Sequence, residues 1–238
     1  MIKRFNDLQQ LNVEAAALFI QAANDAITQN GYFTVALTGG SSPIGLYQLL
    51  AQAPYRDQVQ WENVYVFWGD ERWVPLDDER SNARMALTTL LKHVPVPEEQ
   101  VFPMWADGVS PQEFAREYEQ TLRLHLQPDG CFDLILLGMG PDGHTASWFP
   151  HTDVLHERNK WVAAYYLDAQ DMYRITLTVP IVNRASHVAV IAYGANKADA
   201  LYEVLKGAPN IEHYPAQLLD RADEQITWFV DEAAASRV

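Results

Sequence analysis

Short apolar stretches alternate along the chain with longer stretches whose apolar positions recur at helical spacing. The first kind is typical of buried strands and the second of amphipathic helices. Strands are predicted at 32–37, 63–68, 132–137, 161–167, 173–179, 186–193 and 226–230. Helices are predicted at 12–29, 43–50, 82–91, 111–126 and 194–206, with a brief turn or helix at 180–185 and a short helix at 215–219. This alternation predicts an α/β fold with a mostly parallel sheet that helices cover on both faces. Because neither a repeat nor a break in composition interrupts it, we expect a single domain over 1–238.

The stretch 132–137 has almost no polar residues and leads into a glycine-rich turn. Such a stretch fits a strand buried on both faces, and the glycines let backbone come close to a ligand. Asp142 can cap a short helix beginning at Gly143, which would place His144 in the first helical turn. The positive end of the helix dipole favours a neutral ring there. A neutral imidazole can act as a base, so His144 is a candidate catalytic residue.

The same turn spells the dinucleotide-binding pattern G-x-G-x-x-G at Gly138, Gly140 and Gly143. The preceding strand and Asp168 also stand roughly where that fingerprint requires them. However, a crossover between parallel strands needs a dozen or more residues, and Pro150 stops this helix after about seven. Nicotinamide binding therefore stays open only as an alternative.

A second glycine turn, 38–43, follows the first predicted strand and reads Thr-Gly-Gly-Ser-Ser-Pro. Ser42 suits the N-cap and Pro43 the first position of the next helix, and exposed N–H groups at such an end bind anions. The turn matches neither the Walker motif nor the nucleophile elbow of hydrolases. An ordinary capped turn is the competing interpretation.

Charged residues follow two other strands. Asp70, Glu71 and Arg72 come directly after the strand at 63–68, and Lys197 stands near the start of a helix, where a cation is unfavourable unless an anion lies there too. In an open parallel sheet, ligands bind outside the carboxyl ends of the strands. The four turns could therefore form one crevice.

Seventeen basic and thirty-one acidic residues give the chain a net charge of −14. This charge opposes nonspecific binding to nucleic acid or to an anionic membrane, and an anionic ligand would need a few placed cations to reverse the field.

No apolar run reaches the length of a membrane span and the N-terminus lacks a signal segment, so we expect a cytoplasmic protein. Cys131 is the only cysteine, which excludes an internal disulfide and a multi-thiolate zinc site.

With these motifs in this order, the sequence resembles the bacterial-type 6-phosphogluconolactonases, which are related to the glucosamine-6-phosphate deaminases. The resemblance covers nearly the whole chain and rests on 38–43, 70–72 with 74–75 and 81–82, 138–147 with 149–150, and 174–178. It implies a Rossmann-like three-layer αβα sandwich. It also implies hydrolysis of 6-phospho-D-glucono-1,5-lactone to 6-phosphogluconate in the pentose phosphate pathway, without a redox cofactor.

The deaminases resemble the chain at Asp70, Asp142 and His144, but they have tyrosine where Arg72 stands and a glutamate a few residues beyond the histidine. Residues 146–149 of this chain hold no carboxylate, and the first one beyond them is Asp153. Ring opening and amine loss therefore lack a partner residue, which favours the lactonase.

Ester hydrolysis by water needs a base, a donor for the carbonyl oxygen as it becomes anionic, and an anchor for the remote phosphate. His144 is the predicted base, and Asp142 or Asp70 would orient its ring. Arg72 and the backbone N–H groups of 138–140 are candidates for the oxyanion. The phosphate would lie on Gly39, Gly40, Ser41 and Ser42, with the lysine that the family places there, Lys197, and with Arg174 as a second clamp.

Besides nicotinamide binding, two alternative functions stay open. The deaminase is one, and a sugar-phosphate-binding module without turnover is another, although such a module would not need His144. His151, Asp153 and His156 suggest zinc, but their spacing matches no usual site, so we expect no metal. A monomer and a homodimer are both compatible with the sequence.

Overall fold

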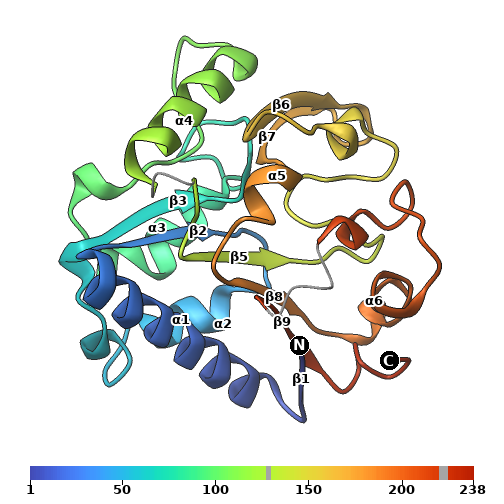
Figure 1. The fold of residues 1–238 in the computed structure, drawn as a ribbon, viewed down its shortest axis with the longest axis horizontal. Helices are drawn as coiled ribbons and strands as arrows, with labels where there is room; N and C mark the ends of the chain where they lie inside the picture. The colour runs from blue at the N-terminus through green and yellow to red at the C-terminus, as the bar shows by residue number, and fades with distance from the viewer. Residues whose placement is uncertain (127–129, 220–224) are drawn as a thin grey trace.

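The computed structural model describes residues 1–126, 130–219 and 225–238. Its centre is a six-stranded sheet in the order β1-β9-β8-β5-β2-β3, in which every neighbouring pair is parallel (Figure 1). The strands are β1 (Ile2–Phe5), β2 (Phe33–Leu37), β3 (Val64–Trp68), β5 (Leu134–Gly138), β8 (Val188–Ala192) and β9 (Ile226–Asp231). The parallel sheet predicted from the sequence is confirmed, and β1 is a strand that the sequence analysis missed.

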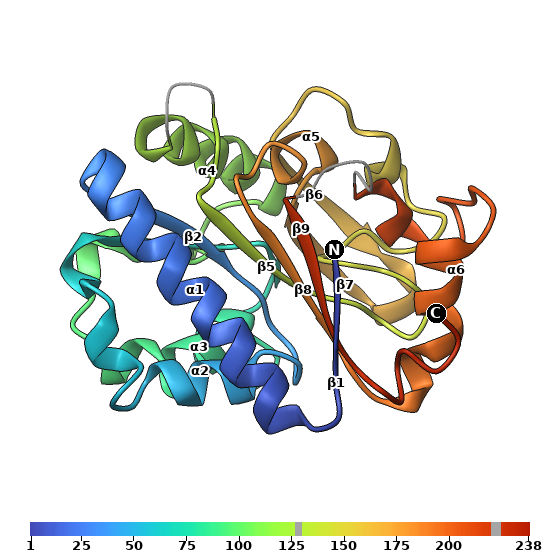
Figure 2. The same ribbon diagram turned by 60° about the horizontal axis from the view of Figure 1, so that its bottom comes forward.

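Helices lie on both sides of this sheet. They are α1 (Leu8–Asn30), α2 (Ile44–Leu50), α3 (Asn82–Thr89), α4 (Pro111–His125), α5 (Val179–Val182) and α6 (Ala198–Lys206). α1 and α2 lie on one side, and α4 and α5 on the other (Figures 1 and 2). The predicted α/β fold, a Rossmann-like three-layer arrangement, is therefore confirmed. No helix within the described ranges combines the length and the apolar character needed to cross a membrane.

The long helix α1 shows how local sequence sets these elements. Asp7 caps it by accepting a hydrogen bond from the backbone N–H of Gln10 at 2.7 Å. Gly31 ends it in the left-handed conformation, with φ of 84°. Its buried face is rich in alanine, which brings the helix axis close to the sheet: Ala15, Ala16, Ala22, Ala23 and Ala26.

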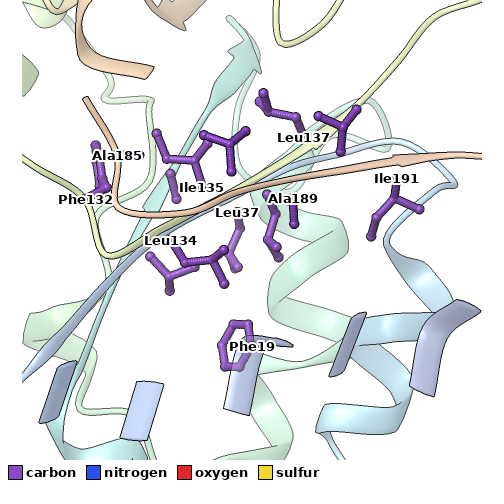
Figure 3. Packing of buried hydrophobic residues seen from close by; sticks show 14 of the residues in the cluster. Phe19, Leu37, Phe132, Leu134, Ile135, Leu137, Ala185, Ala189 and Ile191 are labelled. Carbon is purple, nitrogen blue, oxygen red and sulfur yellow. The ribbon is translucent and has the colours of Figure 1, made fainter. Parts of the chain in front are cut away.

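The core fills both faces of the central strands. The first four residues of β5, Leu134 to Leu137, are at most 1% exposed. Figure 3 shows Leu134 on the same side of the sheet as Phe19 of α1, while Ile135 and Leu137 point to the other side. Because successive side chains of a strand alternate between its faces, a run of apolar residues is what a doubly covered strand requires.

A second, three-stranded sheet is antiparallel and has the order β4-β7-β6. Its strands are β4 (Asp70–Arg72), β6 (Val162–Leu167) and β7 (Met172–Leu177). The sequence analysis predicted β6 and β7 as strands but treated 70–72 as a charged loop. Arg72 pairs with Arg174 across this sheet, so two guanidinium groups start from adjacent positions.

Glu71 joins the small sheet to α3. Its carboxylate is fully buried and accepts hydrogen bonds from the backbone N–H groups of Arg72, Asn82 and Ala83 and from Oγ of Ser81, at 2.7 to 3.0 Å. Burial raises the pKa of Glu71, and the three backbone N–H groups oppose that rise. The start of α3 is thus fixed to the strand that carries Asp70 and Arg72.

Glu71→Gln is expected to lower the free energy of unfolding by about 2 kcal/mol, because an amide NH₂ would face donors that now share a carboxylate oxygen. Urea unfolding measures this loss. The exposed Glu99→Gln is the control and should change stability by less than about 0.5 kcal/mol. Equal stability of the two variants would show that these hydrogen bonds contribute nothing net.

Candidate active site

The turns at the carboxyl edge of the parallel sheet surround one cavity of about 250 Å³. Nine of the ten residues singled out from the sequence line it: Gly39, Gly40, Ser41, Ser42, Asp70, Arg72, His144, Arg174 and Lys197. The tenth, Asp142, contacts the ring of His144. The predicted crevice is therefore present, and the glycine turn and the imidazole face the same hollow.

The turn 38–43 is shaped by close packing. A Cβ atom on Gly39 would lie 1.8 Å from Oδ1 of Asn82, so only glycine fits there. The predicted N-cap role of Ser42 is wrong, because α2 begins at Ile44 with Pro43 as its N-cap and no side chain caps it. A turn closed by the Ile44 N–H on the Ser41 carbonyl, at 3.3 Å, precedes the helix instead. The Ser42 hydroxyl lies beside Gly138.

His144 lies in a turn and not in a helix, which corrects the sequence analysis. Gly143 and Ala146 have φ of 76° and 46°, in the left-handed region, which an α-helix cannot include. The turn is held by hydrogen bonds from Gly140 N–H to the His144 carbonyl, at 2.8 Å, and from Gly143 N–H to the Gly140 carbonyl, at 3.1 Å. The helix dipole therefore does not act on this imidazole.

The group that acts on the imidazole is the carboxylate of Asp142. Its Oδ1 lies 2.5 Å from Nδ1 of His144 and also accepts the His144 backbone N–H at 3.2 Å. Because a carboxylate only accepts, it favours the tautomer with the proton on Nδ1, which leaves a lone pair on Nε2. Burial alone would raise the pKa of Asp142, but its interactions with His144 outweigh burial and lower it.

The Asp70 carboxylate is hydrogen-bonded to groups other than the imidazole. Its Oδ2 accepts the hydroxyl of Ser147 at 2.6 Å, and its Oδ1 lies 3.3 Å from Nδ2 of Asn82. Of the two carboxylates left open by the sequence, Asp142 is the one beside His144.

Not all of the backbone N–H groups proposed to bind the oxyanion are available. The Gly140 N–H is already donated to the His144 carbonyl, so it is not free to bind a ligand. This removes one of the amides in the predicted set 138–140. Arg72 lines the cavity and stays a candidate for the oxyanion.

Three cations line the cavity and reverse the acidic field of the chain locally. Arg174 is only 3% exposed, and its Nη1 lies 3.9 Å from Oδ2 of Asp70. Burial lowers the pKa of Arg174, whereas Asp70 raises it. Burial likewise lowers the pKa of Lys197, and Asp142 opposes this. Among the described residues, the Nε atoms of Arg72 and Arg174 are buried without a hydrogen-bond partner.

The lining residues that sequence analysis missed include Asn82, Phe149 and Gln170. Asn82 and Phe149 belong to the motifs that carry the family resemblance, so proximity to these motifs was an available signal. Gln170 lies in the short connection between β6 and β7 and accepts a hydrogen bond from Arg174. No glycine or charge run marks it, and only the antiparallel pairing of the two strands brings it to the cavity.

The segment after β5 concerns two further points from the sequence, the dinucleotide fingerprint and the suggested zinc site. No crossover helix follows β5, since the chain runs through turns and a short 3₁₀ helix, Asp153–His156, into β6. The dinucleotide fingerprint therefore lacks its helix. His156 pairs with Glu212 at 2.8 Å, and the described part of the chain holds no cluster of three or more His, Cys, Asp or Glu side chains suited to a metal ion.

Comparison with known proteins agrees with this geometry. The family model described as glucosamine-6-phosphate isomerases/6-phosphogluconolactonase matches residues 6–228. A 6-phosphogluconolactonase of Synechocystis sp. is 37% identical over 97% of this chain and 95% of its own length. The crystal structure of 6-phosphogluconolactonase from Leishmania guyanensis superposes with a TM-score of 0.87 at 28% identity, covering 100% of this chain and 98% of the other.

A monomeric glucosamine-6-phosphate deaminase superposes with a TM-score of 0.85 at 20% identity, covering 100% of this chain and 99% of the other, which shows a shared fold alone. The motifs, the cavity that they form and the matches over nearly the full length all agree. The chain belongs to the family of glucosamine-6-phosphate isomerases and 6-phosphogluconolactonases.

Proposed function

We propose that the protein hydrolyses 6-phospho-D-glucono-1,5-lactone to 6-phosphogluconate, with residues 1–238 acting as one lactonase domain. The observation that carries this proposal is the contact between Asp142 and His144 at a cavity that three cations also line. A base beside three cations suits a substrate that carries both an uncharged ester and an anionic phosphate. The base would activate the water that attacks the ester, and the cations would bind the phosphate. The reaction needs water and no redox cofactor.

In the proposed mechanism, Nε2 of His144 takes a proton from the water molecule whose oxygen attacks C1 of the lactone. Asp142 stabilises the imidazolium that forms. Arg72 lies on the cavity wall and stabilises the charge on the carbonyl oxygen. The bond between C1 and the ring oxygen then breaks, and the imidazolium returns its proton to that oxygen.

The phosphate is held at the other end of the substrate. We assign it to the turn Gly39 to Ser42, to Lys197 and to Arg174, which all line the cavity. Phosphate binding far from the reacting carbon fixes the lactone relative to the base.

The deaminase activity fits the same cavity less well. Asp70 is the only carboxylate that lines it among the described residues, and the wall beyond His144 is formed by Ala146 and Phe149. An aminosugar would therefore meet no second carboxylate for proton transfer. This observation favours the lactonase.

A direct assay tests the proposal. Purified protein should release acid from freshly prepared 6-phosphogluconolactone faster than the spontaneous hydrolysis, and should release no ammonia from glucosamine-6-phosphate. Ammonia release would assign the deaminase instead, and absence of both activities would favour a binding module. A cytoplasmic location and a monomeric or homodimeric state stay predictions from the sequence, the second testable by light scattering.

Lys197→Ala is expected to raise KM for 6-phosphogluconolactone about 10- to 100-fold with a small change in kcat, because a charged hydrogen bond to phosphate is lost. Turnover of unphosphorylated glucono-1,5-lactone should not change, which separates phosphate binding from general damage. Lys206→Ala, an exposed lysine at the end of the helix that Lys197 precedes, is the matched control. An unchanged KM in Lys197→Ala would mean that the phosphate lies elsewhere.

A further inference from the structure

One aromatic ring contacts both the proposed base and one of the arginines. The centroid of the Phe149 ring lies 4.2 Å from that of His144, with 26° between the planes. The Cζ atom of Arg174 lies 5.3 Å from the centroid of the same ring. Phe149 lines the cavity, and its side chain is also well packed, since the residue is only 8% exposed.

The segment that carries this ring is anchored on both sides. The preceding Trp148 is fully buried and donates its Nε1–H to the Leu177 carbonyl at 2.8 Å. The Phe149 carbonyl accepts the hydroxyl of Thr152 at 2.6 Å. The first bond ties the segment to β7, the strand of Arg174, and the second closes the turn that follows Phe149, so the ring has a fixed position against the imidazole.

A stacked ring acts on His144 in two ways. It restricts rotation of the imidazole, which keeps Nε2 aimed at the attacking water. Its electron-rich face also attracts the positive charge that the imidazole gains during attack, an effect that strengthens when water is excluded. Asp142 holds the imidazole only through Nδ1, so the ring supplies a restraint that the carboxylate does not.

Other charged groups surround the imidazole and must be weighed with the ring. Asp142 also favours the imidazolium, whereas the cations of the cavity oppose it. These groups come from the turn itself, from the small sheet and from the start of α6: Asp142, Asp70, Arg72, Arg174 and Lys197. All of them remain when Phe149 is replaced, so a change in that variant reports the ring.

We propose that Phe149 is a positioning residue of this reaction, whose ring fixes the His144 imidazole for attack and stabilises the imidazolium. This inference rests on the proposed function of His144 as the base. It adds a residue that acts through the base without taking part in the proton transfer.

The test compares aliphatic and aromatic replacements. Phe149→Leu and Phe149→Met should lower kcat about three- to tenfold. They should also move the midpoint of the acidic limb of the kcat/KM profile to lower pH by about half a unit, because an imidazolium without the ring loses its proton more readily. Phe149→Tyr keeps the aromatic face and should restore both values to within about twofold of the wild type.

Phe5→Leu is the control for packing. Phe5 is 7% exposed and stacks on Phe229 with centroids 6.2 Å apart, outside the cavity. Phe5→Leu should lower Tm, as the Phe149 variants should too, but it should leave the pH profile unchanged. If Phe149→Tyr and Phe149→Met lose the same activity and neither moves the acidic limb, the ring only fills space and the inference is wrong. A wild-type profile with no acidic limb would instead remove the proposed base itself.

Discussion

His144→Ala is expected to lower kcat on 6-phosphogluconolactone by on the order of 10² to 10⁴, the usual contribution of a positioned general base. KM should change little, because the cations proposed to hold the phosphate are untouched. The fold should also be retained, since the imidazole is 26% exposed and its loss leaves no large buried cavity. Initial rates measured above the spontaneous hydrolysis give this result directly.

The control for this variant is His93→Ala, which removes an exposed histidine from outside the cavity. It should have wild-type kcat and KM. Turnover of His144→Ala within twofold of the wild type would exclude His144 as the base, even if the protein remains a lactonase.

Gly140→Ala is expected to lower kcat by on the order of 10²-fold, the loss that follows when a catalytic group is displaced by about 1 Å. A Cβ atom at this position would lie 2.1 Å from Nδ1 of His144 and 2.5 Å from Oδ1 of Asp142. Both side chains would have to move, which breaks their contact. Since both are partly exposed, they can do so without unfolding the protein.

Gly69→Ala is the matched control, because its added Cβ would meet only ordinary contacts of 3.6 Å or more. Steady-state kinetics and thermal melting should show that Gly140→Ala keeps its Tm and loses kcat, while Gly69→Ala keeps both. A fully active Gly140→Ala would show that the geometry of Asp142 and His144 does not limit the reaction.

Much of the fold follows from apolar patterning. The stretch at 132–137 predicts β5 because a strand covered on both faces must be apolar at every position. β1 escapes this logic, since it is only four residues long, carries Lys3 and Arg4, and lies at the edge of the sheet. Its place depends on pairing with β9, at the opposite end of the chain, which no local pattern encodes.

The small sheet shows a second limit to what the sequence pattern predicts. The alternation in 161–167 and 173–179 predicts two strands, but it does not reveal their partner. β4 has only three residues, all charged, and its strand conformation comes from pairing with β7. The pairing brings Arg72 next to Arg174, and neither residue's own neighbours in the sequence indicate this.

In the site, the glycine turns predicted which segments meet, because turns after parallel strands converge at one edge. The local conformation was harder to predict. Asp142 before Gly143 resembles a helix start, and the structure uses the same two residues for a turn with positive φ at Gly143. A side chain that accepts hydrogen bonds from nearby backbone N–H groups suits both conformations. Gln170 has no pattern at all, as its position comes from the β6–β7 pairing.

A crystal structure of the protein with bound 6-phosphogluconate tests most directly the claim that one sugar phosphate bridges the two ends of the cavity. We predict that the phosphate lies within hydrogen-bond distance of Nζ of Lys197 and of the turn Gly39 to Ser42. The C1 carboxylate should lie beside Nε2 of His144. A phosphate beside His144, or a ligand bound outside this cavity, would contradict the proposed mechanism.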